Sequence, residues 1–252
     1  MTRAVGGRRL ILPAAVAAIL LCAGLAFALT GRPLAPRSPG ATAPAPAPAG
    51  PAGAAGSCSQ GQPRVPRVSL ASVRWSGFYG VELPVSAQAG PYDTSGGAAA
   101  GFAHTPLGAL LAAVNIGVRA NAQWGPRIFG AVIRGQVTGP DAAALLSGCQ
   151  AAYDQAAQSR GVTGGQPLGT VDVAEQAFRW ITYTPAAAIL DLAVAGPGAG
   201  GATVRASVQM EAVWDGGDWK VVAPPGGDWG NSAAELSSLA GYTAFPDPGS
   251  GR

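Results

Sequence analysis

The ten residues VWDGGDWKVV (213–222) hold two of the six tryptophans of a chain of 252 residues. Their pattern predicts a β-hairpin, because glycines accept the positive φ angles that tight turns require. With Gly216 and Gly217 in the turn, Trp214 faces Trp219 across the two strands. Such an aromatic pair contributes about 0.2–1 kcal/mol and fixes the register of the strands. We therefore expect both tryptophans to be structural residues of a half-buried sheet.

The two aspartates beside these glycines bear on the length of the turn. In a two-residue loop, Asp215 and Asp218 would oppose each other, which is mildly repulsive. A four-residue Asp-Gly-Gly-Asp loop would relieve the repulsion and keep the same tryptophan pair. The sequence is compatible with both loops.

The apolar and β-branched residues of this half of the chain predict further strands before the hairpin, a short one at 171–173 and two longer ones at 177–183 and 188–195. The two strands of the hairpin itself are predicted at 203–214 and 219–223. One or two short strands are also expected within 68–88, at the entrance of the domain.

Three helical segments are predicted between the entrance strands and the sheet. Thr105 and Pro106 form the first start signal, a hydroxyl cap followed by a proline in the first turn. One apolar stripe follows at helical spacing: Leu107, Leu110, Leu111, Val114 and Val118. The second segment begins at Gly125-Pro126, and the third begins at 139–141 and ends near Arg160-Gly161.

This order of elements predicts the fold class. Helices that precede an antiparallel meander are typical of an α+β fold, here three helical segments packed on one face of a curved antiparallel sheet. The apolar fraction of 48% is sufficient for a core.

Charge is divided unevenly along the chain. Residues 1–62 hold five arginines and no acid, a net of +5, and the remainder holds 11 basic against 13 acidic residues, a net of −2. A nucleic-acid-binding domain needs clustered Lys and Arg, so direct binding to nucleic acid is not expected.

Residues 10–29 predict a transmembrane signal anchor. They are twenty uncharged, mostly apolar residues, which at helical rise span a hydrocarbon core of about 30 Å. The cytoplasmic N-terminus, 1–9, carries three arginines, so the rest of the chain is expected outside the membrane. A Pro/Ala/Gly-rich disordered linker follows at 30–63, then an extracytoplasmic α+β domain at 64–247 and a tail at 248–252.

Two other interpretations of the leader stay open. Residues 26–28 (AFA) offer a signal-peptidase site, which would make the protein secreted. A lipoprotein would use Cys22, but Leu21 occupies the position that needs a small residue. The anchor is favoured because the apolar run exceeds the usual signal-peptide length of about 7–15 residues.

The other two cysteines, Cys58 and Cys149, lie in the part expected to be exported. In an oxidising compartment they can form one disulfide, worth about 4–5 kcal/mol on the chain-entropy model. The alternative is two unpaired thiols.

Three stretches carry a family resemblance: 73–91 (VRWSGFYGVELPVSAQAGP), 101–120 (GFAHTPLGALLAAVNIGVRA) and 136–146 (QVTGPDAAALL). They resemble uncharacterised anchored proteins of high-GC bacteria that are often associated with conjugative elements. The layout is also similar to the single-span component of conjugation and type IV secretion machines. That resemblance covers roughly 73–225 and implies a nuclear-transport-factor-2-like cone fold for the extracytoplasmic domain.

Candidate catalytic residues are few. His104 is the single histidine, and we interpret it as a helix-entry residue in a surface turn. The acidic pairs Asp172/Glu175 and Asp215/Asp218 could bind a cation or act as acid and base, but turns and strand edges commonly carry such charges. The sequence contains no phosphate-loop, nucleophile-elbow or zinc motif, so no catalytic residue, metal or cofactor is expected.

These observations favour a non-enzymatic, membrane-anchored scaffold or assembly protein, of a conjugative DNA-transfer apparatus. Its expected partners are the membrane, other envelope or secretion proteins and further copies of itself. One alternative is a cone-fold domain that binds a small ligand or acts as an isomerase or dehydratase; another is a cleaved, secreted envelope protein. A ligand site should show titratable residues inside a cavity, whereas a scaffold should fill that volume with apolar side chains.

Overall fold

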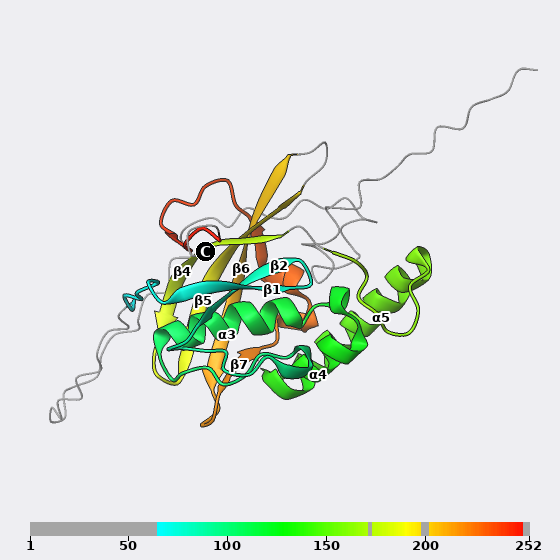
Figure 1. Cartoon of the computed structure of the whole chain (residues 1–252), viewed down its shortest axis with the longest axis horizontal. Helices are drawn as coiled ribbons and strands as arrows, with labels where there is room; N and C mark the ends of the chain where they lie inside the picture. The colour runs from blue at the N-terminus through cyan, green and yellow to red at the C-terminus, as the bar shows by residue number, and fades with distance from the viewer. Residues whose placement is uncertain (1–64, 171–172, 198–201, 249–252) are drawn as a thin grey trace, which may run out of the picture.

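Three α-helices lie against an open, mostly antiparallel sheet in the computed structural model, which describes residues 65–170, 173–197 and 202–248 (Figure 1). This confirms the α+β class and the three helices on a sheet. The predicted anchor at 10–29 and linker at 30–63 lie outside the described residues. Within the described residues, none of the helices combines the length and apolar character needed to cross a bilayer.

Four strands form the meander at the centre of the sheet: β4 (Ala174–Tyr183), β5 (Ala187–Pro197), β6 (Thr203–Trp214) and β7 (Trp219–Val222). They pair antiparallel in chain order. Three short strands extend the sheet: β3 (Val137–Thr138) beside β7, β8 (Ala233–Glu235) beside β6 and β9 (Thr243–Ala244) beside β4. The β3–β7 pairing is parallel.

The entrance of the domain is a separate hairpin, made of β1 (Val73–Phe78) and β2 (Val81–Ser86). Four short 3-10 helices fill connections: η1 (Ser95–Gly97), η2 (Ala122–Trp124), η4 (Pro225–Gly227) and η5 (Trp229–Ser232).

Each α-helix begins at its predicted signal. The first, α3 (Pro106–Arg119), is capped by Thr105, whose hydroxyl oxygen accepts from the Gly108 amide at 3.1 Å. The second, α4 (Pro126–Gln136), follows Gly125. The third, α5 (Ala142–Arg160), ends at a left-handed glycine, as helices commonly do.

The α3 helix is more deeply buried than a single apolar stripe predicts. Its residues 108–116 are all buried, on every side of the helix. The sheet covers one side, and the β1–β2 hairpin covers another (Figure 1). The hairpin is joined to the helix by Asn115, whose side-chain amide donates to the Pro84 carbonyl at 2.8 Å. Helices that are apolar all round are buried in this way.

Two contacts set the position of α3. A Cβ atom at Gly108 would lie 1.9 Å from the Ala103 carbonyl oxygen, so only glycine allows this close approach. At the other end, the Arg119 guanidinium lies over the Phe78 ring, 4.3 Å from its centroid, and donates to the Asn115 side-chain oxygen at 2.6 Å. The helix is therefore held near both ends, by the loop before it and by Phe78 of β1.

Candidate functional site

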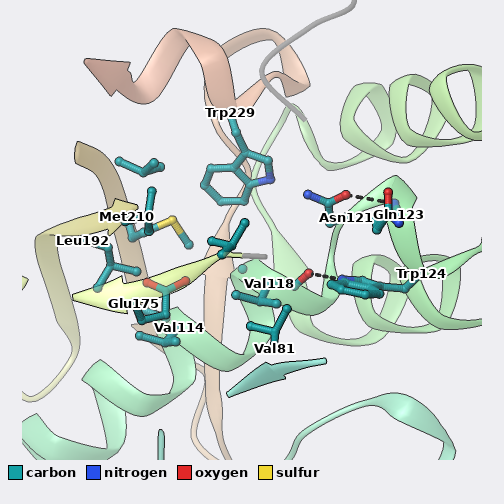
Figure 2. Close-up of a pocket in the computed structure, with 15 residues that line it drawn as sticks. Val81, Val114, Val118, Asn121, Gln123, Trp124, Glu175, Leu192, Met210 and Trp229 are labelled. Atoms are coloured by element: carbon teal, nitrogen blue, oxygen red, sulfur yellow. Dashed lines mark hydrogen bonds between the residues drawn. The ribbon is translucent and has the colours of Figure 1, made fainter. Parts of the chain in front are cut away.

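A cavity of about 120 Å³ lies between α3 and the sheet (Figure 2). Its walls come from α3, η2, β2, β4, β5, β6 and η5, and most of the side chains that line it are aliphatic. Five lining residues are only half-buried, so the cavity opens to solvent beside them: Gly117, Val118, Asn121, Val173 and Val208.

One acidic residue lies in this apolar wall. Glu175 of β4 is 7% exposed, and its buried Oε2 atom has no hydrogen-bond partner among the described residues. Burial away from water raises the pKa of Glu175 to about 8, so the carboxyl group carries a proton at neutral pH. Its predicted companion, Asp172, lies outside the described residues.

A β-bulge turns Glu175 toward the helices. Along β4 the pairing with β5 shifts between Glu175 and Ala177, so that Glu175 opposes Val194 and Phe178 opposes Leu192. Val194 and Leu192 are two residues apart and share one face of β5. The extra residue in β4 therefore places Glu175 on the same face as Phe178, although strict alternation would put them on opposite faces.

A second buried polar group lines the cavity without a partner. Trp229 of η5 is 7% exposed, and its Nε1 atom has no hydrogen-bond acceptor. Trp124 also lines the cavity, but its Nε1 donates to the Val118 carbonyl at 2.6 Å (Figure 2). Sequence reasoning singled out neither Trp229 nor the cavity, because both depend on contacts between distant segments.

The predicted hairpin lies away from this cavity. Trp214 opposes Trp219 in the register that the sequence predicts, with ring centroids 5.6 Å apart. The Asp215 amide donates to the Asp218 carbonyl at 3.1 Å, whereas the Asp218 amide donates to the Asp215 side chain at 3.0 Å. The turn is thus a four-residue loop, with Gly216 at a φ of 94°.

The two aspartates of the loop have separate partners and do not form a cation site with each other. Asp215 forms an ion pair with Lys220 at 2.9 Å, and this contact lowers its pKa to about 2. Asp218 instead accepts from the backbone amides of Gly101 and Phe102, at 2.7 Å and 2.9 Å. Among the described residues, no group of three or more His, Cys, Asp or Glu side chains could hold a metal ion.

His104 is exposed and is not one of the residues that line the cavity. Its ring stacks on Trp214, with 4.1 Å between centroids, and its Nε2 atom lies 2.6 Å from the Pro185 carbonyl oxygen. His104 thus lies at the start of α3, as the sequence predicts, and it also packs on the hairpin through Trp214.

Cys149 is buried on α5, and its Sγ atom lies 3.6 Å from the Ala120 carbonyl oxygen. Cys58 lies outside the described residues, so the disulfide between the two stays a prediction.

Comparison with known proteins identifies one family. The model of a family described as "Domain of unknown function (DUF8175)" matches residues 37–244, which is more than half of the chain. No curated protein and no solved structure matches the chain. The chain belongs to this family, the domain of unknown function DUF8175.

Proposed function

We propose that the domain binds a small, mostly apolar molecule in the cavity between α3 and the sheet, with Glu175 as a polar contact. The apolar walls supply the burial that drives binding of such a molecule. The opening at the half-buried edge gives the molecule a path from solvent.

The unpartnered carboxyl group of Glu175 carries this proposal. A buried polar atom without a hydrogen bond costs about 1–3 kcal/mol. Most buried polar groups in folded proteins have a partner, so each exception calls for a physical reason. A ligand that hydrogen-bonds to the Glu175 carboxyl would remove this cost and supply the reason.

The cavity volume limits the size of the buried part of the ligand. An apolar cavity of about 150 Å³ holds a benzene molecule. At about 120 Å³, this cavity accommodates a ring or chain of similar size. A larger ligand would extend through the open edge.

Binding without turnover is the role we propose, because Glu175 is the one titratable side chain among the described residues that line the cavity. Acid–base catalysis usually needs a second positioned group that accepts or donates a proton. We also propose that the domain has the cone fold of nuclear-transport-factor-2-like domains. The cavity between the helices and an open sheet supports this proposal.

The predicted anchor at 10–29 would hold this binding domain outside the membrane. Membrane fractionation and sequencing of the mature N-terminus test that prediction. A membrane-bound protein that retains Met1 is expected, and a soluble protein that begins after residue 28 would mean that the leader is cleaved.

A scaffold role in DNA transfer stays a prediction from the order of segments along the chain, and neighbouring genes for a DNA-pumping ATPase would favour it.

Ligand-induced stabilisation tests the proposed binding. Cyclohexanone at about ten times its Kd should raise the free energy of unfolding of the full chain by about 1.4 kcal/mol. Ala113→Leu places a larger side chain in the cavity wall and should abolish the gain. Ala151→Leu makes the same change on the exposed surface of α5, and this variant should show the same gain in free energy of unfolding as the wild type. Equal gains in all three proteins would contradict binding in the cavity.

A further inference from the structure

Building on the proposed function, we propose that the cavity selects an uncharged ligand that carries a hydrogen-bond-accepting oxygen, such as a small ketone. The oxygen would accept from the Nε1–H group of Trp229 or from the carboxyl group of Glu175. The apolar remainder of the ligand would lie against α3, β5 and β6.

Trp229 supplies the first argument. An indole N–H group can only donate, so any partner for it must be an acceptor. The Trp229 side chain is buried and lines the cavity, and its donor is unused. The preceding Asp228 carboxylate accepts from the Gly230 amide at 2.8 Å and caps η5. No described residue accepts from this donor, and a ligand oxygen in the cavity would supply the acceptor.

Glu175 supplies the second argument. The elements packed against it contribute aliphatic, amide and indole side chains to the cavity, and none of these side chains is charged. Two cations on neighbouring elements have other partners: Arg119 of α3 contacts Asn115 and Phe78, and Arg205 of β6 donates to Gln176. None of the described residues that line the cavity is a cation, so burial keeps the proton on the carboxyl group, which can then donate a hydrogen bond into the cavity.

An uncharged acceptor suits both groups, whereas charged ligands do not. A carboxylate ligand would lose its hydration in an apolar cavity without a cation to pair with. An ammonium ligand could pair with Glu175 only after the carboxyl group ionises, and it offers nothing to the Trp229 donor. A hydrocarbon would leave both polar groups unsatisfied.

The protonation of Glu175 makes this preference depend on pH. Burial raises its pKa to about 8, so the donor is present below that pH and lost above it. Ionised Glu175 would repel a carbonyl oxygen. The affinity for a ketone should therefore fall as the pH rises through about 8.

Three ring compounds of similar size test the inference on the full chain labelled with ¹⁵N-tryptophan: cyclohexanone, methylcyclohexane and cyclohexylammonium. At about pH 6.5, where Glu175 is protonated, we expect cyclohexanone to bind about tenfold more tightly than methylcyclohexane. It should also shift the indole N–H signal of Trp229, which Trp229→Phe identifies. At about pH 9 the affinity for cyclohexanone should be about tenfold weaker.

Three variants separate the contributions of Trp229 and Glu175 to ketone binding. Trp229→Phe removes one of the two donors and should reduce the preference for the ketone, whereas Trp124→Phe, in the same cavity, should keep it because that indole N–H already bonds to Val118. Glu175→Gln keeps a donor of similar shape without a titrating group, so its affinity for cyclohexanone should not change between the two pH values.

The other outcomes are distinct. Equal binding of ketone and hydrocarbon would overturn this inference and would leave standing only the binding of an apolar molecule in the cavity. Tightest binding of the ammonium compound would also overturn this inference, but it would keep Glu175 as the polar contact of the proposed function. Binding of none of the three compounds would overturn both.

Discussion

The imidazole ring of His104 lies flat on the indole ring of Trp214, with 4.1 Å between centroids and 8° between planes. This contact joins the start of α3 to the β6–β7 hairpin. Two further contacts join the same segments: Trp219 Nε1 donates to the Ala103 carbonyl at 3.0 Å, and the Asp218 carboxylate accepts two backbone amides from the loop before α3. The hairpin therefore fixes the start of the helix that lines the cavity.

Replacement of Trp214 by alanine should lower the free energy of unfolding by about 2 kcal/mol. A fully buried aromatic residue costs about 3–5 kcal/mol on truncation, and Trp214 is half-buried. The melting temperature should fall by about 5 °C. Ile181→Ala, at an exposed apolar side chain, serves as the control and should change the free energy by less than about 0.5 kcal/mol. An unchanged melting temperature for Trp214→Ala would refute its structural role.

Asp218→Ala should also destabilise the protein, by about 2 kcal/mol, because hydrogen bonds to charged groups are stronger than neutral ones. The Gly101 and Phe102 amides would lose their acceptor, so their hydrogen exchange should become faster. Asp215→Ala removes the neighbouring carboxylate, which bonds within its own loop and to Lys220, and should leave the exchange of both amides unchanged. Unchanged exchange in Asp218→Ala would contradict the contact.

Glu175 should make the stability of the protein fall between about pH 5 and about pH 8. The pKa of this residue is about 8 in the folded protein, against 4.5 for an ordinary glutamate in water. Over that window the unfolded chain releases a proton that the folded protein retains, so stability decreases as the pH rises. The total loss is on the order of 4 kcal/mol.

Urea unfolding of wild type and Glu175→Gln at a series of pH values measures this loss. Glutamine does not titrate, so the variant should gain stability relative to wild type as the pH rises, with the largest gap near pH 8. A gap that stays constant with pH would show that the carboxyl group ionises normally in the folded state.

The predicted disulfide between Cys58 and Cys149 can be tested by mass spectrometry of exported, non-reduced protein. We expect one peptide pair joined through these residues, and its reduction should lower the free energy of unfolding by about 4 kcal/mol on the chain-entropy model. Cys149→Ser provides the unbridged control. Two free thiols in the exported protein would reject the pairing.

Much of the fold could be predicted from residues that are close together in the sequence. The start of α3 depends on Thr105 and Pro106, and the register of the hairpin depends on two tryptophans around two glycines, so neighbouring residues contain the information. The covering of α3 by the β1–β2 hairpin could not be predicted, because it brings together elements that are distant in the sequence.

The candidate site was less predictable than the fold. Glu175 was noticed as part of an acidic pair, but its direction depends on a bulge that shifts the strand by one residue. Trp229 enters the cavity from a short 3-10 helix after the sheet, with no periodic pattern to mark it. Composition singled out His104, the one histidine, yet its partner Trp214 lies on a distant strand.

The state of the Glu175 carboxyl group is the claim on which the cavity proposal depends most. Carboxyl ¹³C NMR of the full chain, with the signal assigned by Glu175→Gln, measures its pKa directly. We predict a pKa of about 8 in the ligand-free protein, the value expected for a carboxyl group buried among apolar side chains. A pKa near 4.5, the ordinary value for glutamate, would show a hydrated or paired carboxylate and would contradict the proposed binding site.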